Sequence, residues 1–116
     1  MRVWHEQLIP LLCRQHLLAT WREGLGAYAI ITGTTITKNG AGYRNHPAVK
    51  EFEKCHCVLW ARLCLIREEM LARSYQPKDL PPFQCIDVCQ EQKYVPWQTL
   101  EEQIEVLRSK KCNCKI

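Results

Sequence analysis

Residues that suit a buried position recur at steps of three and four along the middle of the chain. They are Val49, Phe52, His56, Leu59, Leu63, Ile66 and Met70. This spacing is typical of an amphipathic α-helix, because residues three and four apart share one face. Pro47 stands at the expected first turn, where a missing N–H costs no hydrogen bond. We therefore predict one long helix from Pro47 onward, about 40 Å in length.

Two further helices are predicted, one on each side of this stretch. The first begins at Pro10 and fades near Gly33. Its apolar stripe consists of Leu11, Leu18, Trp21, Leu25 and Tyr28. The last begins at Thr99, which is followed three residues later by Glu102 in the pattern of a capping box. Its apolar line consists of Leu100, Ile104 and Leu107.

The connections between these helices are rich in glycine, asparagine and proline and show no convincing strand alternation. The stretches 34–47 and 76–96 are therefore expected to be irregular. The fold class predicted is all-α: a compact single domain over residues 1–116, made of three main helices. The length suits one domain, and a hydrophobic fraction of 47% is enough for a core.

The net charge and the first residues of the chain limit the partners and the cellular location that we expect. Lys and Arg number 16 against 12 Asp and Glu, for a net charge of +4, which permits a nucleic-acid partner but also fits an ordinary basic protein. No apolar run approaches the roughly 20 residues that cross a bilayer. The residues from Met1 to Glu6 do not resemble a signal peptide. We therefore expect a cytoplasmic protein with no membrane partner, whose eight cysteines are mostly reduced.

Four cysteines raise the question of a metal. Cys85, Cys89, Cys112 and Cys114 would supply thiolates to one zinc ion if the C-terminal tail folded back on the preceding loop. Neither spacing is that of the usual zinc knuckle. The sequence therefore predicts no metal and no other cofactor.

The other cysteines show no catalytic pattern. Cys55 and Cys57 fall inside the predicted long helix, where residues two apart point about 200° away from each other and cannot easily share a metal. We interpret them, like Cys13 and Cys64, as packing thiols. His56 between them is expected to be half-buried.

Polar residues share one side of the first predicted helix. Gln15 and Arg22 are seven apart and nearly eclipse each other on a helical wheel. His16 and Glu23 are also seven apart and nearly eclipse each other, about 100° around the helix from the first pair. Gly26 lies on the same arc and leaves space for a substrate or for the chain's own N-terminus. The pattern also fits a solvated helix face with an Arg–Glu pair.

The string Gln15-His16-Leu17, followed by Arg22-Glu23, resembles the first helix of the phage endonuclease V family of pyrimidine-dimer DNA glycosylases and abasic lyases. The segments 42–47 and 94–96 are similar to other parts of this family. The resemblance covers nearly the whole chain. It implies that the N-terminal segment is inserted between the helices, so that Met1 meets Glu23.

The resemblance also implies a chemistry. Met1 is expected to remain on the chain, because Arg2 is too bulky for the usual methionine removal. Its α-amine is then the nucleophile that attacks C1′ of a damaged nucleotide and expels the base. The imine that forms then undergoes β-elimination, which cuts the strand. Glu23 is expected to stabilise the developing positive charge and to move protons. The residues expected to contact DNA are Arg2, Gln15, His16, Arg22, Arg44, His46, Arg108 and Lys111.

Some features leave alternatives open. His46 fits either a helix cap or a phosphate contact at a helix start. Gly26 replaces an arginine of the family, and the phage protein's aromatic C-terminal tail is absent, so the preference between pyrimidine dimers and abasic sites stays open. We expect a monomeric enzyme acting on damaged double-stranded DNA without an obligatory protein partner. The alternatives are a lyase that acts only on abasic sites and a non-catalytic DNA-binding or interaction module held together by zinc.

Overall fold

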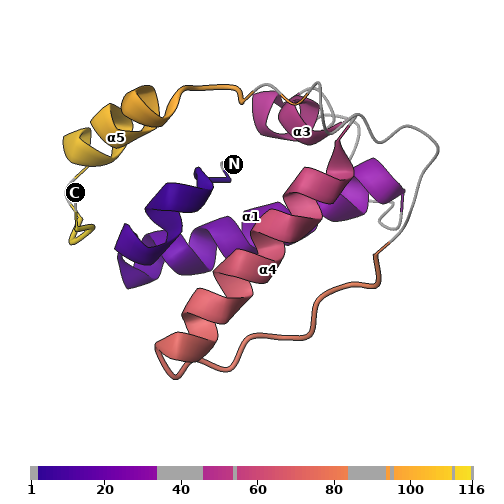
Figure 1. The fold of residues 1–116 in the computed structure, drawn as a ribbon, viewed down its shortest axis with the longest axis horizontal. Coiled ribbons are helices and arrows are strands. Elements are labelled where there is room, and N and C mark those ends of the chain that lie inside the picture. Colours follow the sequence, from indigo (N-terminus) through magenta and orange to yellow (C-terminus); the bar gives the residue numbers. More distant parts are fainter. Residues whose placement is uncertain are drawn as a thin grey trace.

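The chain folds into helices that cross around a shared core (Figure 1). The computed structural model describes residues 3–33, 46–53, 55–83, 94, 96–110 and 112–115, and within these ranges it contains no strand. A short 3₁₀ helix, η1 (Glu6–Leu11), is followed by α1 (Arg14–Thr32), α3 (Pro47–Phe52), α4 (His56–Ala72) and α5 (Leu100–Ser109). The all-α prediction is confirmed.

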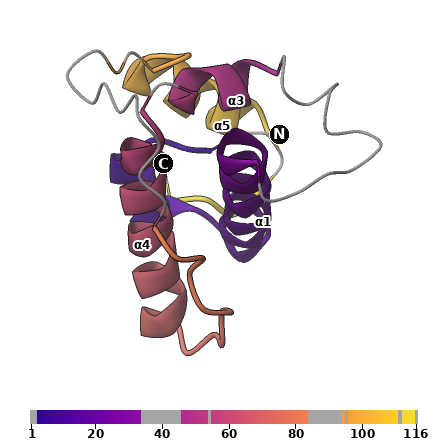
Figure 2. The same cartoon turned by 90° about the vertical axis from the view of Figure 1, so that its right-hand side faces the viewer.

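Helices α1 and α4 pack closely against each other at the centre of the fold (Figure 2). Gly24 of α1 lies against α4, where an added Cβ would lie 2.7 Å from Leu63 Cδ2. Leu63 is completely buried, as are Leu17 of α1 and Ile66 of α4. Glycine at this position lets the two helices approach more closely than any side chain would allow.

Helix α1 begins later than predicted, at Arg14 instead of Pro10. Pro10 lies inside η1, and the two residues that follow η1, Leu12 and Cys13, have extended backbone angles. In one continuous helix Leu8 and Leu12 would lie on the side opposite Leu17. The break between η1 and α1 lets all three side chains enter the core.

The predicted end of α1 is confirmed, and its buried face is broader than predicted. Gly33 caps the helix in the left-handed conformation, with φ 73°, which glycine adopts without strain. Trp21 and Tyr28 are buried as expected, whereas Leu11, Leu18 and Leu25 are only half-buried. The other buried residues of α1 are Leu17, Thr20, Gly24, Ala27, Ile30 and Ile31.

The prediction of one long central helix is wrong. Helix α3 ends at Phe52, and Cys55, with φ −145° and ψ 52°, precedes a separate helix α4. The break turns α3 so that Glu51 accepts hydrogen bonds from the Tyr94 hydroxyl and, at 3.2 Å, from the Trp97 N–H. Every one of the seven periodic positions is nevertheless buried, because the break preserves the face that each helix turns toward the core.

The break also changes the setting of the neighbouring cysteines. Cys55 is the buried N-cap residue of α4, so it does not lie inside a helix. His56 is completely buried, where a half-buried imidazole was predicted. Cys57 is disulfide-bonded, which corrects its interpretation as a reduced packing thiol. Cys64 of α4 carries a free, half-buried thiol.

Helix α5 begins as predicted. Thr99 Oγ1 accepts from the Glu102 N–H, and Glu102 Oε1 accepts from the Thr99 N–H, each at 3.2 Å, which completes the capping box. Leu107 of α5 is buried in the common core. Residues 75–83, in the connection that precedes α5, are irregular and run back along α4 (Figure 1). No helix in the described ranges is both long enough and apolar enough to span a membrane.

Candidate active site

The N-terminal segment lies inside the fold, between α1, α4 and α5. Val3 and Trp4 are only 4% and 3% exposed. The Trp4 N–H donates to Thr20 Oγ1 of α1 at 3.3 Å, and Arg62 Nη1 of α4 donates to the Trp4 carbonyl at 2.9 Å. The inserted N-terminal segment, implied by the family resemblance, is present for the described residues from Val3 onward.

A third helix holds the next residue of the segment. The His5 N–H donates to Gln103 Oε1 of α5 at 2.7 Å, and Gln103 Nε2 donates to the Gln98 carbonyl at 3.0 Å. Burying a polar group without a hydrogen bond is costly, so these bonds specify where the segment lies. The segment therefore has a defined register between the three helices.

Three buried polar side chains perform this anchoring, and the sequence analysis missed them. Thr20, Arg62 and Gln103 are each at most 5% exposed. Each lies among apolar residues on the buried face of its helix. A polar residue at such a position is the signal in the sequence that indicates a buried hydrogen-bond partner. The Arg62 guanidinium also lies over the Phe52 ring, 5.8 Å from its centroid. Its charge is thus shared between a carbonyl and an aromatic face.

The polar arc predicted on α1 is present and borders this segment. Gln15 and Arg22 are exposed, whereas His16 and Glu23 are half-buried. The imidazole of His16 meets the Trp4 ring edge to face, with ring centroids 6.0 Å apart. Gly24, directly after Glu23, lies against Val3, since its added Cβ would be 3.8 Å from Val3 Cγ2. The arc and the start of the chain thus form one continuous region.

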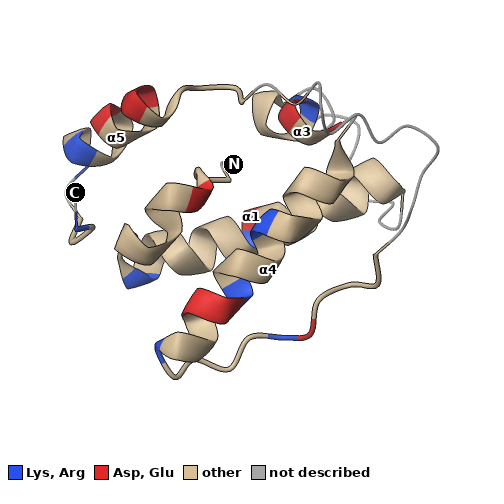
Figure 3. Ribbon diagram, in the orientation of Figure 1, with Lys and Arg blue, Asp and Glu red and all other residues tan. Residues whose placement is uncertain are grey.

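His16 lies in a mixed electrostatic environment. Burial and the positive charge of Lys110 lower the pKa of His16, and the Glu23 carboxylate opposes this shift. Because the ordinary pKa of histidine is about 6.5, His16 is mainly neutral at pH 7. The tail that follows α5 is hydrogen-bonded to Cys13 and Leu11, which brings the C-terminal end of α5 near the start of α1. In Figure 3, acidic residues lie at the start of α5 and a basic residue lies at its end.

The other residues expected to contact DNA are not all brought together. His46 is the N-cap of α3, where its Nδ1 accepts from the Ala48 N–H at 3.1 Å, so its capping role is confirmed. Helix α3 lies far from the C-terminal end of α5, where Arg108 is exposed and pairs with Glu105 at 3.3 Å (Figure 1). Met1, Arg2, Arg44 and Lys111 lie outside the described residues.

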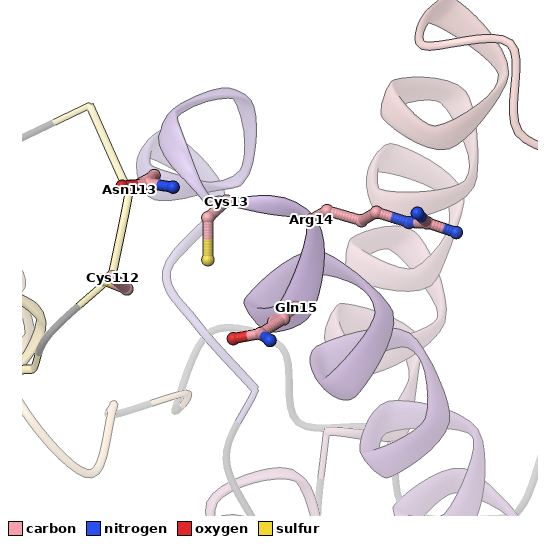
Figure 4. A pocket seen from close by; sticks show the side chains of 5 residues that line it. All are labelled: Cys13, Arg14, Gln15, Cys112 and Asn113. Atoms are coloured by element: carbon pink, nitrogen blue, oxygen red, sulfur yellow. The ribbon is translucent and has the colours of Figure 1, made fainter.

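A cleft opens beside the arc, between the start of α1 and the C-terminal tail. It is lined by Cys13, Arg14, Gln15, Cys112 and Asn113. In Figure 4 the Cys13 side chain points into the space between α1 and the tail, Gln15 extends to the side of the tail, and Arg14 extends toward α4. Cys13 is half-buried and borders this cleft, so its side chain lies at the edge of the core.

Sulfur and nitrogen ligands gather at this cleft. Cys13 and His16 of α1 approach Cys112 and Cys114 of the tail, with their ligand atoms all within 4.8 Å of one another. The zinc set considered from the sequence combined the tail cysteines with Cys85 and Cys89, which lie outside the described residues. Among the described residues, this cluster is the group able to hold a metal ion.

Fold and site together define a class: a small helical protein whose buried N-terminal segment borders a polar helix face. The chain belongs to the pyrimidine dimer DNA glycosylase family, whose model matches residues 1–80. The matched region contains η1, α1, α3 and α4, and it ends before α5 and the cysteine-containing tail. Neither a curated protein nor a solved structure matches the chain. The predicted family is confirmed.

Proposed function

We propose that the protein is a DNA glycosylase with abasic lyase activity, which acts on damaged duplex DNA through the α-amine of Met1. The observation that carries this proposal is the burial of the N-terminal segment beside the polar arc of α1. Two residues reach at most about 7 Å, which supports a Met1 amine that acts close to the anchored Val3. Glu23 of the same arc influences His16 electrostatically, and His16 contacts Trp4 of the segment.

The anchoring of the segment has a chemical purpose in this proposal. A nucleophile held next to its target reacts much faster than one that must be found by diffusion, provided that the geometry is maintained. Thr20, Arg62 and Gln103 bind the backbone of Trp4 and His5, so they position the terminus without touching the substrate. They are positioning residues for the amine.

The proposed reaction proceeds by two covalent steps. The neutral amine donates its electron pair to C1′ as the bond from C1′ to the damaged base breaks, and the base leaves with a proton. Opening of the sugar ring at C1′–O4′ then gives the imine. Loss of the C2′ proton and cleavage of the C3′–O bond to phosphate complete the β-elimination. An α-amine has a pKa of about 8, so a useful fraction is neutral at pH 7.

Glu23 is assigned to charge stabilisation and proton transfer in this reaction. A carboxylate beside the sugar stabilises the positive charge that develops at C1′ and exchanges protons with the leaving groups. Arg22 and Gln15 are exposed on the same helix and are assigned to the phosphodiester backbone. Extrusion of the damaged nucleotide costs least where pairing is already weakened, which favours lesions over intact DNA.

Borohydride trapping tests the proposal. Reduction of the imine by borohydride should join the full-length protein covalently to abasic or dimer-containing duplex, and mass spectrometry should map the bond to residue 1. A matched protein with a few added N-terminal residues should give no such complex, because its amine lies outside the region beside Glu23. A bond mapped to Lys110 or Lys111 would overturn the assignment of the nucleophile. The absence of any trapped complex from protein with a verified free terminus would leave a non-catalytic binder.

One observation favours a narrower activity, that of a lyase specific for abasic sites. Gly26 has open space where the family resemblance leads one to expect an arginine, so one phosphate contact is missing from the arc. Bending and opening an intact dimer site requires more binding energy than opening an abasic site. Comparison of trapping on the two duplexes separates the possibilities, since an abasic-only lyase would react with the abasic duplex alone.

A further inference from the structure

The start of α1 and the tail that follows α5 meet in a cluster of side chains that can bind a metal and that the proposed reaction does not use. Cys13 is the N-cap of α1 and His16 lies in its first turn. Cys112 and Cys114 belong to the tail that follows α5. His16 Nδ1 lies 3.2 Å from Cys13 Sγ and 3.3 Å from Cys114 Sγ. All four ligand atoms lie within 4.8 Å of one another.

These separations suit a tetrahedral metal centre. A zinc ion bound at about 2.3 Å to sulfur and about 2.0 Å to nitrogen separates its ligand atoms by about 3.5–3.8 Å from one another. The two separations from His16 Nδ1 lie just below that range and no separation exceeds 4.8 Å, so shifts of up to about 1 Å would bring the atoms to ideal geometry. Three thiols and one imidazole form a known structural zinc set, and the absence of carboxylate oxygens from the cluster disfavours magnesium or calcium.

The backbone around the cluster is already arranged for binding. The Cys13 N–H donates to Cys114 Sγ at 3.1 Å, and an N–H directed at sulfur favours the thiolate that a metal needs. One residue further on, the Lys115 N–H donates to the Leu11 carbonyl at 2.8 Å, which holds the tail against the start of α1. Little reorganisation is therefore needed to complete the site.

The location of the cluster argues against simple packing. Cys13, His16, Cys112 and Cys114 are all half-buried, outside the fully buried core. Cys13 and Cys112 line the cleft of Figure 4, which provides a path for an ion to enter. Packing cysteines are usually fully buried, as Cys55 is at 4% exposure.

We propose that Cys13, His16, Cys112 and Cys114 bind one zinc ion that joins the C-terminal tail to the start of α1. Four protein ligands leave no open coordination position, so the ion is structural and takes no part in catalysis. The three cysteines bind as thiolates, so their protons are released on metal binding. His16 is then a zinc ligand, which removes it from the residues assigned to DNA.

The proposed ion would have a clear structural effect. It connects residues about 100 positions apart in the chain, and long loops gain the most from being closed. The tail lies outside the part of the chain that matches the family model, so the zinc would attach an unmatched segment to the matched region. The basic end of α5 would then be held beside Gln15.

Metal analysis of the full-length, reduced protein tests this proposal without reference to activity. The expected result is one equivalent of zinc per chain that survives dialysis. Replacement by Co²⁺ should give the visible absorption bands of a tetrahedral thiolate site. Cys114→Ser and His16→Ala should lose bound zinc and the cobalt bands, whereas Cys64→Ser, a free thiol elsewhere on α4, should retain both.

Several outcomes would overturn the zinc site. One is metal-free protein, with reduced thiols, that shows no cobalt bands. Another is a disulfide between Cys13 and a tail cysteine in the protein as isolated, with no zinc. Equal loss of zinc in Cys64→Ser and Cys114→Ser would also count against it. Because zinc content is measured without DNA, failure here leaves the proposed imine chemistry untouched.

Discussion

Gly24 and Gly26 stand two residues apart in α1, and alanine at the two positions should have different effects on stability. A Cβ at Gly24 would lie 2.7 Å from Leu63 Cδ2, well inside van der Waals contact. Leu63 is completely buried, so its side chain cannot move without disturbing its neighbours. A Cβ at Gly26 would meet nothing within 4 Å.

The expected magnitudes follow from these surroundings. Replacing glycine by alanine inside a helix adds about 1 kcal/mol of stability, and both variants gain this contribution. Overpacking a buried site costs about 1–3 kcal/mol, and only Gly24→Ala incurs that cost. Gly26→Ala should therefore exceed Gly24→Ala in free energy of unfolding by about 1–3 kcal/mol. That difference corresponds to roughly 4–12 °C in Tm for a domain of this size.

Urea unfolding followed by tryptophan fluorescence measures the difference, since Trp4 and Trp21 are buried in the fold. Equal slopes with denaturant would show that the midpoint shift reports stability alone. Adding Leu63→Ala to Gly24→Ala should remove the clash, so the double variant should be more stable than the sum of the single effects predicts. Equal stability of Gly24→Ala and Gly26→Ala would refute the close approach of α1 and α4, and with it the position of Val3 against Gly24.

Two further predictions concern the arc itself. Glu23→Gln should reduce single-turnover cleavage of abasic duplex on the order of 100-fold, with DNA binding nearly unchanged, because the charge acts in the transition state. Full cleavage by this variant would remove Glu23 from the mechanism. Gly26→Arg fills open space with a cation and should tighten duplex binding at low salt. It should also steepen the salt dependence by about one phosphate contact relative to Gly26→Ala. An unchanged salt dependence, measured by fluorescence anisotropy, would show that this face does not meet DNA.

Features that depend on neighbouring residues were predictable. The capping box of Thr99 and Glu102 and the glycine cap at Gly33 formed as expected, because each needs only residues within one helical turn. The break between α3 and α4 was not predictable in the same way. Residues on both sides of Cys55 keep a helical spacing of buried positions, so periodicity alone shows no interruption.

The break between η1 and α1 has a similar cause. A proline at a helix start suits both a 3₁₀ turn and an α-helix, so Pro10 did not distinguish them. The distinction depends on where Leu8 and Leu12 find a core, and that core is formed partly by α4, which contacts η1. Tertiary packing therefore determines where η1 ends and α1 begins.

The sequence by itself determined the helical class, the polar arc from Gln15 to Glu23 and the likeness to a repair family, because all three follow from residue types at short, regular spacing. The resemblance predicted an inserted N-terminal segment, but only the tertiary structure decided that Thr20, Arg62 and Gln103 hold it. It also decided that the cysteines of the tail meet the first turn of α1. These contacts join residues up to about 100 positions apart, and such pairs form only when the hydrophobic packing of whole helices brings them together.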